Sequence, residues 1–329
     1  MVNQFTQALD DLYTTTWQKR LPGVFDNVFT AAPFWFWLKD KGKLKPVRGG
    51  RFLETNLEYA QNSTVQWIAK GGTVAMNDFK FLTVAQYQWR YLVANILRFG
   101  IDEQQNSGDS RIIDWVNAKL NNTEESLTST LETTLGAGSG AATLPAPAID
   151  GLQFLVPDFA NIASASFNAG GIDPSVYTWW QNQAIDMTGL SFAVNGIAKM
   201  RHLLNLCMNN RRMDAPDIIL SDMSSYEFYE DAVLPMLRIN NNRLADAGFE
   251  NQTFKRIPMV WSPALTGRMY FLNTRFIEFV YDPGYFFDMT EWKAIPNQVN
   301  DRAAQVELAC SFMTNRRRVL GVLSTIDTQ

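Results

Sequence analysis

The feature that most constrains the fold is a long stretch of alternating apolar and polar residues between Arg51 and Ile96. Alternation with a period of two is typical of β-strands, and the turn-forming residues Lys70, Gly71 and Gly72 divide the stretch into two halves. The pattern predicts a β-hairpin with sides of about 15 to 20 residues, or about 50 to 65 Å. A two-stranded ribbon of that length is marginally stable in water, so we expect another surface to cover it.

The composition favours a chain that buries large surfaces against partners. Its 329 residues exceed the usual size of one compact domain, which predicts either two cores or one core with long extensions. Hydrophobic residues make up 46% and charged residues only 19%, a low charged fraction for a soluble monomer. Aromatic residues reach 13%, and these side chains bury the most area per residue in cores and interfaces.

The charge and the cysteine content argue against several classes of protein. The net charge is −4 and the pI is near 5.2, so the chain lacks the overall positive field that holds nucleic acid. Cys207 and Cys310 have no metal-binding spacing and are expected to be buried thiols. The sequence shows no basic leader and no apolar run of about 20 residues, so we expect a protein made in the cytoplasm that does not enter a membrane.

A cluster of four consecutive aromatic residues, Phe34, Trp35, Phe36 and Trp37, lies within the first 45 residues. Four such residues cannot all face one side of a single helix or strand, so some are expected to meet a second surface. A neighbouring chain could supply that surface. A terminal segment folded back on its own core explains the cluster equally well.

Patterns after residue 100 predict an α+β fold with a mixed sheet. Apolar residues recur at near-helical spacing from Ile112 to Leu135, which predicts a helix of about 25 residues. Ser107 or Asp109 would cap it, and Asn121–Thr123 would interrupt it. A loop rich in Gly and Pro follows. Further elements are expected at residues 190–208 (helix), 218–220 (strand), 226–237 (helix), and 259–262, 269–281 and 302–326 (strands).

Several local sequences carry a resemblance to a known family. Asp217–Ser221 leads directly into Ser225–Tyr229, and Phe276–Asp282 is followed by the ending Ala309–Asn315 with Arg317–Gly321. In their order with the terminal arm, the long hairpin and the long helix, these pieces resemble the Hong Kong-type fold of tailed-phage major capsid proteins. The resemblance covers the chain from roughly residue 45 to its end.

The resemblance implies a division of the chain into an arm, a peripheral domain and an axial domain. The implied boundaries are an N-terminal arm at residues 1–45, an extended hairpin loop and the start of the peripheral domain at 46–100, the peripheral domain with spine helix and loop at 101–150, a mainly axial domain at 151–285, and return strands at the peripheral/axial junction at 286–329.

The resemblance also implies a function, a major capsid protein that self-assembles into the icosahedral shell of a tailed bacteriophage and encloses packaged double-stranded DNA. The implied partners are copies of itself in hexamers and pentamers, a separate scaffolding protein, a portal, a decoration protein, and DNA bound without sequence specificity. One alternative is an encapsulin-like nanocompartment shell protein. Another, from a different class, is a phage-associated protein that binds or hydrolyses polysaccharide.

Contacts between subunits are the expected site in such a protein. Arg316 and Arg317 belong to the densest basic run and favour intersubunit ion pairs, with contact to packaged DNA as the alternative. The expected intersubunit residues are Phe34, Trp35, Trp37, Trp67, Ile68, Lys70, Phe79, Arg316 and Arg317. His202 has no visible catalytic partner, and Glu124 and Glu125 are expected on a solvated helix face, so we predict no catalytic residue, no cofactor and no metal site.

Overall fold

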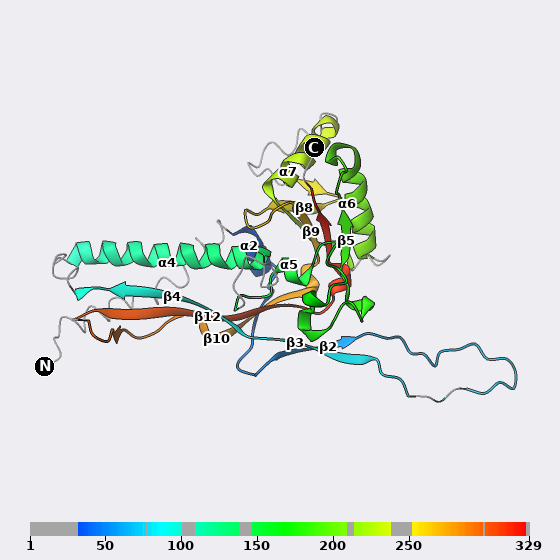
Figure 1. The fold of residues 1–329 in the computed structure, drawn as a ribbon, viewed down its shortest axis with the longest axis horizontal. Coiled ribbons are helices and arrows are strands. Elements are labelled where there is room, and N and C mark those ends of the chain that lie inside the picture. Colours follow the sequence, from blue (N-terminus) through cyan, green and yellow to red (C-terminus); the bar gives the residue numbers. More distant parts are fainter. Residues whose placement is uncertain are drawn as a thin grey trace.

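The computed structural model describes residues 32–74, 76, 78–100, 109–137, 147–208, 214–237, 252–298 and 300–326. Most of the expected N-terminal arm, the candidate cap Ser107 and most of the expected Gly- and Pro-rich loop lie outside these residues. Figure 1 shows a compact body, a long helix that runs beside long strands on one side, and a thin loop that projects on the opposite side.

The long strands form a five-stranded sheet. β10 (Ile277–Met289) and β12 (Arg302–Thr314) pair antiparallel, and β12 also pairs antiparallel with β4 (Arg90–Arg98). Two short strands complete the sheet, β1 (Leu44–Pro46) parallel to β10 and β11 (Lys293–Ala294) antiparallel to β12. We call this element the long sheet.

The compact body is built on a six-stranded mixed sheet. Its order is β5 (Gln183–Asp186), β13 (Gly321–Ser324), β9 (Arg268–Leu272), β6 (Ile218–Ser221), β8 (Ile257–Trp261) and β7 (Thr253–Phe254). The helices α6 (Phe192–Met208) and α7 (Met223–Leu237) pack on it through an apolar cluster that includes Leu203, Tyr229 and Phe271. The expected helix, strand and helix between residues 190 and 237 are confirmed.

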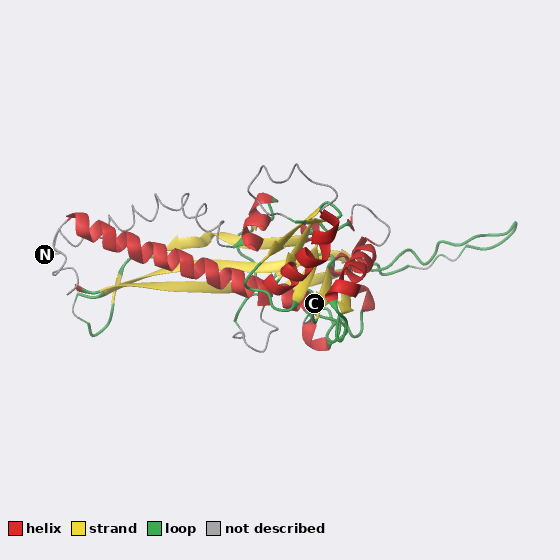
Figure 2. Ribbon diagram, turned by 90° about the horizontal axis from the view of Figure 1, so that it is seen from above, coloured by secondary structure: helices red, strands yellow, loops and turns green. Residues whose placement is uncertain are grey.

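The long helix α4 (Asp109–Ala137) runs beside the long sheet without the expected interruption, as Figures 1 and 2 show. Asn lowers helix stability by only a few tenths of a kcal/mol, whereas Leu127, Leu131 and Leu135 are buried along one face. Glu124, which we expected on a solvated face, is also buried. No helix among the described residues is long and apolar enough to span a bilayer.

The predicted hairpin exists, but its paired part is much shorter than expected. Only β2 (Leu53–Glu58) and β3 (Leu82–Tyr87) form a two-stranded ribbon, and the last backbone hydrogen bond beyond them runs from the amide of Tyr59 to the carbonyl of Phe81. Past the stack of Tyr59 on Trp179, no other part of the described chain lies beside these residues (Figures 1 and 2), so the ladder stops where packing stops. The predicted return strand is also divided, because β4 leaves the ribbon and joins the long sheet.

The aromatic cluster begins the described chain as the short helix α2 (Pro33–Asp40). Phe34 and Trp35 are 2% and 1% exposed and pack edge to face on Phe312 and Phe279 of the long sheet. They also join the main apolar cluster, which spans both sheets. The helix is therefore docked on its own core, and the expectation that these two side chains contact neighbouring subunits is corrected.

Candidate assembly surfaces and the elements that position them

The most exposed apolar surface lies on residues 59–81, which we call the extended loop. Both views show it projecting from the body with no other part of the described chain beside it (Figures 1 and 2). The ring of Tyr59 at its base stacks on Trp179 of the body, and the exposed large apolar side chains beyond it are Val65, Trp67, Ile68, Val74, Met76 and Phe81. Trp67 is fully exposed and Met76 is 93% exposed. A folded chain rarely leaves such a set in water unless another molecule covers it.

The tip of the extended loop is a tight turn, as the sequence predicts. The amide of Gly72 donates to the carbonyl of Ala69 at 2.9 Å, and Gly71 adopts a positive φ of 86° that favours glycine. Lys70 is exposed on this turn. Farther back, Phe79 is half-buried against Phe81, with ring centroids 5.4 Å apart. The loop therefore carries apolar and basic side chains to a point far from its own core.

A second apolar surface lies on the long sheet. One face is covered by α4, where Ile96, Leu127 and Val306 form a small buried cluster. On the other face of β4, Tyr91, Val93 and Leu97 are exposed. Opposite residues on β12 share this face and include the exposed Gln305, which donates to the side chain of Asn95 at 3.0 Å. We call this the open face of the long sheet.

The basic run near the C-terminus is partly built into its own body. Arg317 is fully buried in the short helix η6 (Arg317–Val319), and its guanidinium donates to the carbonyls of Leu155 and Phe167 at 2.8 and 3.1 Å. Burial lowers the pKa of Arg317 to about 10. Arg316 forms an ion pair with Asp214 at 3.0 Å within the same chain. The expectation of an intersubunit ion pair is thus corrected for Arg317, whose side chain is buried in its own body. For the partly exposed Arg316 it stays a prediction.

The remaining expected contact residues fall into two groups. Trp37 is half-buried, with the ammonium of Lys41 4.5 Å from its ring centroid. Trp67, Ile68 and Lys70 lie on the extended loop and are exposed. For Trp37, for these three loop residues and for Phe79, contact with a neighbouring copy stays a prediction.

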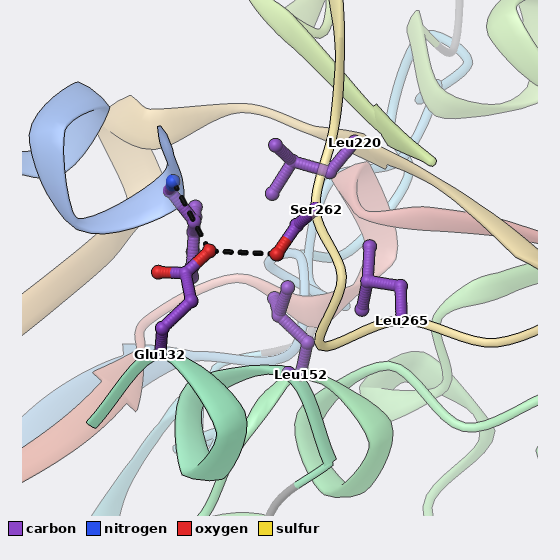
Figure 3. Close-up of a pocket in the computed structure, with 7 residues that line it drawn as sticks. Glu132, Leu152, Leu220, Ser262 and Leu265 are labelled. Atoms are coloured by element: carbon purple, nitrogen blue, oxygen red, sulfur yellow. Dashed lines mark hydrogen bonds between the residues drawn. The ribbon is translucent and has the colours of Figure 1, made fainter. Parts of the chain in front are cut away.

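Sequence reasoning missed the residue that ties α2 to the body. Glu132 of α4 accepts hydrogen bonds from the amides of Phe34 and Trp35 at 3.4 and 3.3 Å and from the Ser262 hydroxyl at 2.7 Å. Figure 3 shows Glu132 and Ser262 pointing toward each other among Leu152, Leu220 and Leu265, with no room between these side chains for a water-sized molecule. The carboxylate joins α2, α4 and the segment after β8. A Glu on the same helix face as Leu135 was the only signal in the sequence.

The buried Glu132 carboxyl should make stability depend on pH. Burial raises its pKa above the ordinary 4.5, and the bonds from Ser262, Phe34 and Trp35 oppose that rise only in part. The folded chain then binds more protons than the unfolded chain. The contribution of Glu132 to the free energy of unfolding is therefore greatest in acid and falls as the pH rises from about 4.5 through the folded pKa. We expect Glu132→Gln to lose less unfolding free energy between pH 4.5 and 7 than the original chain, measured by urea unfolding of the unassembled subunit.

The exposed Glu125 on the same helix provides the control for that measurement. Glu125→Gln should leave the pH dependence of the unfolding free energy as it is in the original chain. Equal slopes for Glu132→Gln and the original chain would show that Glu132 does not titrate differently on folding.

Comparison with known proteins places this architecture. No family model and no curated protein sequence matches the chain. Among solved structures, it is similar to a subunit in the capsid asymmetric unit of cyanophage A-1(L), with a TM-score of 0.67 and 17% identity over 87% of this chain and 91% of that one. It is also similar to the SrpI encapsulin of Synechococcus elongatus, with a TM-score of 0.56 and 13% identity over 88% and 87%. A third similar structure is a capsid subunit of a native GTA particle, with a TM-score of 0.53 and 10% identity over 86% of this chain and 88% of that one.

These likenesses show the fold, which this chain shares with the subunits of the three particles. The chain has the Hong Kong-type capsid fold, and the α+β class and the resemblance drawn from the sequence are confirmed.

Proposed function

We propose that this chain is the major capsid protein of a tailed bacteriophage and self-assembles into an icosahedral shell around packaged double-stranded DNA. The observation that carries the proposal is the extended loop, an apolar projection that its own body leaves uncovered, on a chain with the Hong Kong-type fold. Its place in the virion and its assembly in the host cytoplasm are parts of the same proposal. In this assignment α4 and the long sheet form the peripheral domain, and the six-stranded sheet forms the axial domain.

The open face of the long sheet supplies a complementary surface for a neighbour. Extended loop and open face are both apolar and both lie outside the core of their own chain. Burial of apolar area on both sides would contribute about 25 cal/mol for each Å² removed from water. We propose that the extended loop of one copy lies over the peripheral domain of the next. Hexamers and pentamers, scaffolding, portal and decoration proteins complete the proposed set of partners.

Expression of the full chain, alone and with candidate scaffolding proteins, tests the proposal. Sedimentation and electron microscopy should show closed particles many times the 37.3 kDa mass of one chain. Monomers that persist in every condition would contradict the proposed function.

A shell protein of the encapsulin kind is the second candidate, favoured by the likeness to the SrpI subunit. The contents of natively produced particles separate the two functions. Nuclease-treated particles that retain double-stranded DNA support the phage capsid, whereas particles that retain a single cargo protein and no DNA support the nanocompartment.

A further inference from the structure

The extended loop leaves the body at one place, where the ribbon of β2 and β3 is held on one of its two faces. Residues on this face, including Leu53, Leu57, Ala85 and Tyr87, are buried, whereas Leu82 and Val84 on the other face are exposed. Whatever lies under the buried face therefore determines the direction in which the loop projects.

A glycine lies directly under that face. Gly170, in the short helix η2 (Ala169–Gly171), has a φ of +66°, and a Cβ added to it would lie 2.7 Å from the Cβ of Ala85 and 3.3 Å from the Tyr87 ring. Contacts below 3.0 Å force one of the two segments to move. Only glycine lets β3 approach this closely.

An aromatic contact holds the ribbon at the start of the extended loop. The ring of Tyr59, directly after β2, stacks on Trp179 with centroids 5.7 Å apart and planes 25° apart. Trp179 belongs to η3 (Thr178–Trp180), and the indole N–H of the neighbouring Trp180 donates to the carbonyl of Ala169 at 2.9 Å. Because Trp180 is buried, this bond joins η3 firmly to η2. We call Ala169, Gly170, Trp179 and Trp180 the seat of the extended loop.

The hydroxyl of Tyr87 fixes the ribbon beside the seat, because it donates to the carbonyl of Thr314 at the end of β12 at 2.7 Å. From this anchored ribbon the extended loop reaches outward. At about 3.3 Å per residue the ribbon is about 20 Å long, and the loop extends up to about 40 Å beyond it. If the ribbon is fixed at its Tyr87 end, a 1 Å lift at the end where the loop begins moves the tip by roughly 2 to 3 Å. Small changes at the seat are thus amplified where copies meet.

We propose that the seat sets the angle at which the extended loop reaches the next copy, and that Gly170 and Trp179 thereby determine the curvature of the shell. They act as positioning residues, since neither is part of the exposed surface of the loop. The inference rests on the proposed shell function.

The adjacent glycine provides a matched control. Gly171 also has a positive φ, +75°, but a Cβ added there would have no atom within 4 Å. Gly170→Ala and Gly171→Ala therefore carry similar backbone strain, and only the first presses on β3. Under conditions in which the original chain forms shells, we expect Gly170→Ala to lose the original size class in favour of other diameters or open sheets. Gly171→Ala should keep the original diameter, measured by electron microscopy.

A second pair tests the same joint without adding bulk. Tyr59→Ala removes the stack on Trp179, whereas Tyr177→Ala removes another exposed ring near Trp179 and leaves the stack in place. We expect the diameter to shift for Tyr59→Ala and not for Tyr177→Ala. If the unassembled Gly170→Ala subunit shows no cooperative unfolding, and so is not folded, this second pair tests the role of the seat instead.

The outcomes separate this inference from the proposed function. Original-sized shells from both Gly170→Ala and Tyr59→Ala would overturn the role of the seat and leave the capsid assignment standing. Equal disturbance by the controls would also overturn it. An original chain that forms no shells in any condition would instead refute the proposed function on which the inference rests.

Discussion

Replacing residues 63–80 of the extended loop with a short Gly-Ser turn is expected to abolish stable shells while the subunit stays folded. These residues contribute exposed apolar side chains and no residue of the described apolar clusters. Their removal should change the unfolding temperature of the unassembled subunit by no more than about 2 °C, as for other surface changes. Sedimentation measures the loss of shells, and thermal unfolding followed by circular dichroism measures the retained fold.

Single substitutions sharpen this test. Trp67→Ala removes the most exposed aromatic ring of the loop and should shift shell formation to clearly higher protein concentrations, because buried aromatic anchors dominate interface energies. Val194→Ala removes another exposed apolar side chain, on α6, and should leave assembly unchanged. Normal shells from the loop replacement, or a subunit that no longer unfolds cooperatively, would contradict the proposed role of the loop.

The sequence predicted the projecting element but not how it is held. Alternation located the two sides of the hairpin and the turn at Lys70–Gly72, because period two and turn chemistry are local properties. The length of the paired ribbon depends on what lies against it. Gly170 limits how closely that support approaches Ala85 of β3, which lies about 85 positions earlier in the chain. No local pattern marks a glycine that a distant strand requires.

The aromatic cluster shows the same division between local and tertiary information. Its four residues indicated that some would meet a second surface. In α2, Phe34 and Trp35 are buried on their own core and Phe36 is exposed, so a second surface for Phe36 stays a prediction. Whether the buried pair met its own chain or a neighbour was open, because either surface would remove the rings from water. In the structure the pair lies on its own chain, where Glu132 accepts hydrogen bonds from two backbone amides of α2. These residues are almost 100 positions apart in the sequence.

The expected contact of Arg317 with a neighbouring copy was wrong for a physical reason. Arginine is charged and usually exposed, so a run of three favours a surface. A buried guanidinium, however, can be satisfied by backbone carbonyls alone, and those of residues 154, 155 and 167 carry no signature in the sequence.

Arg317→Met is therefore expected to lower the unfolding free energy of the unassembled subunit by about 3 to 5 kcal/mol. Methionine fills a similar length but donates no hydrogen bond, so the buried carbonyl of Leu155 and the part-buried carbonyls of Phe154 and Phe167 lose this donor. Each buried acceptor left without a donor costs about 1 to 3 kcal/mol, and the relief of burying a charge offsets part of the sum. Urea unfolding at neutral pH measures the change.

Arg318→Met is the matched control, because its side chain is the exposed neighbour in the same run. Its substitution should cost less than about 1 kcal/mol, as is usual for exposed charges. The unassembled subunit is the decisive sample, since a contact between copies cannot contribute to its stability. A loss that appears for Arg317→Met only in assembled shells would restore the intersubunit role, whereas a loss in the isolated subunit places Arg317 in the joint between η6, α5 (Leu152–Leu155) and η1 (Ala165–Phe167).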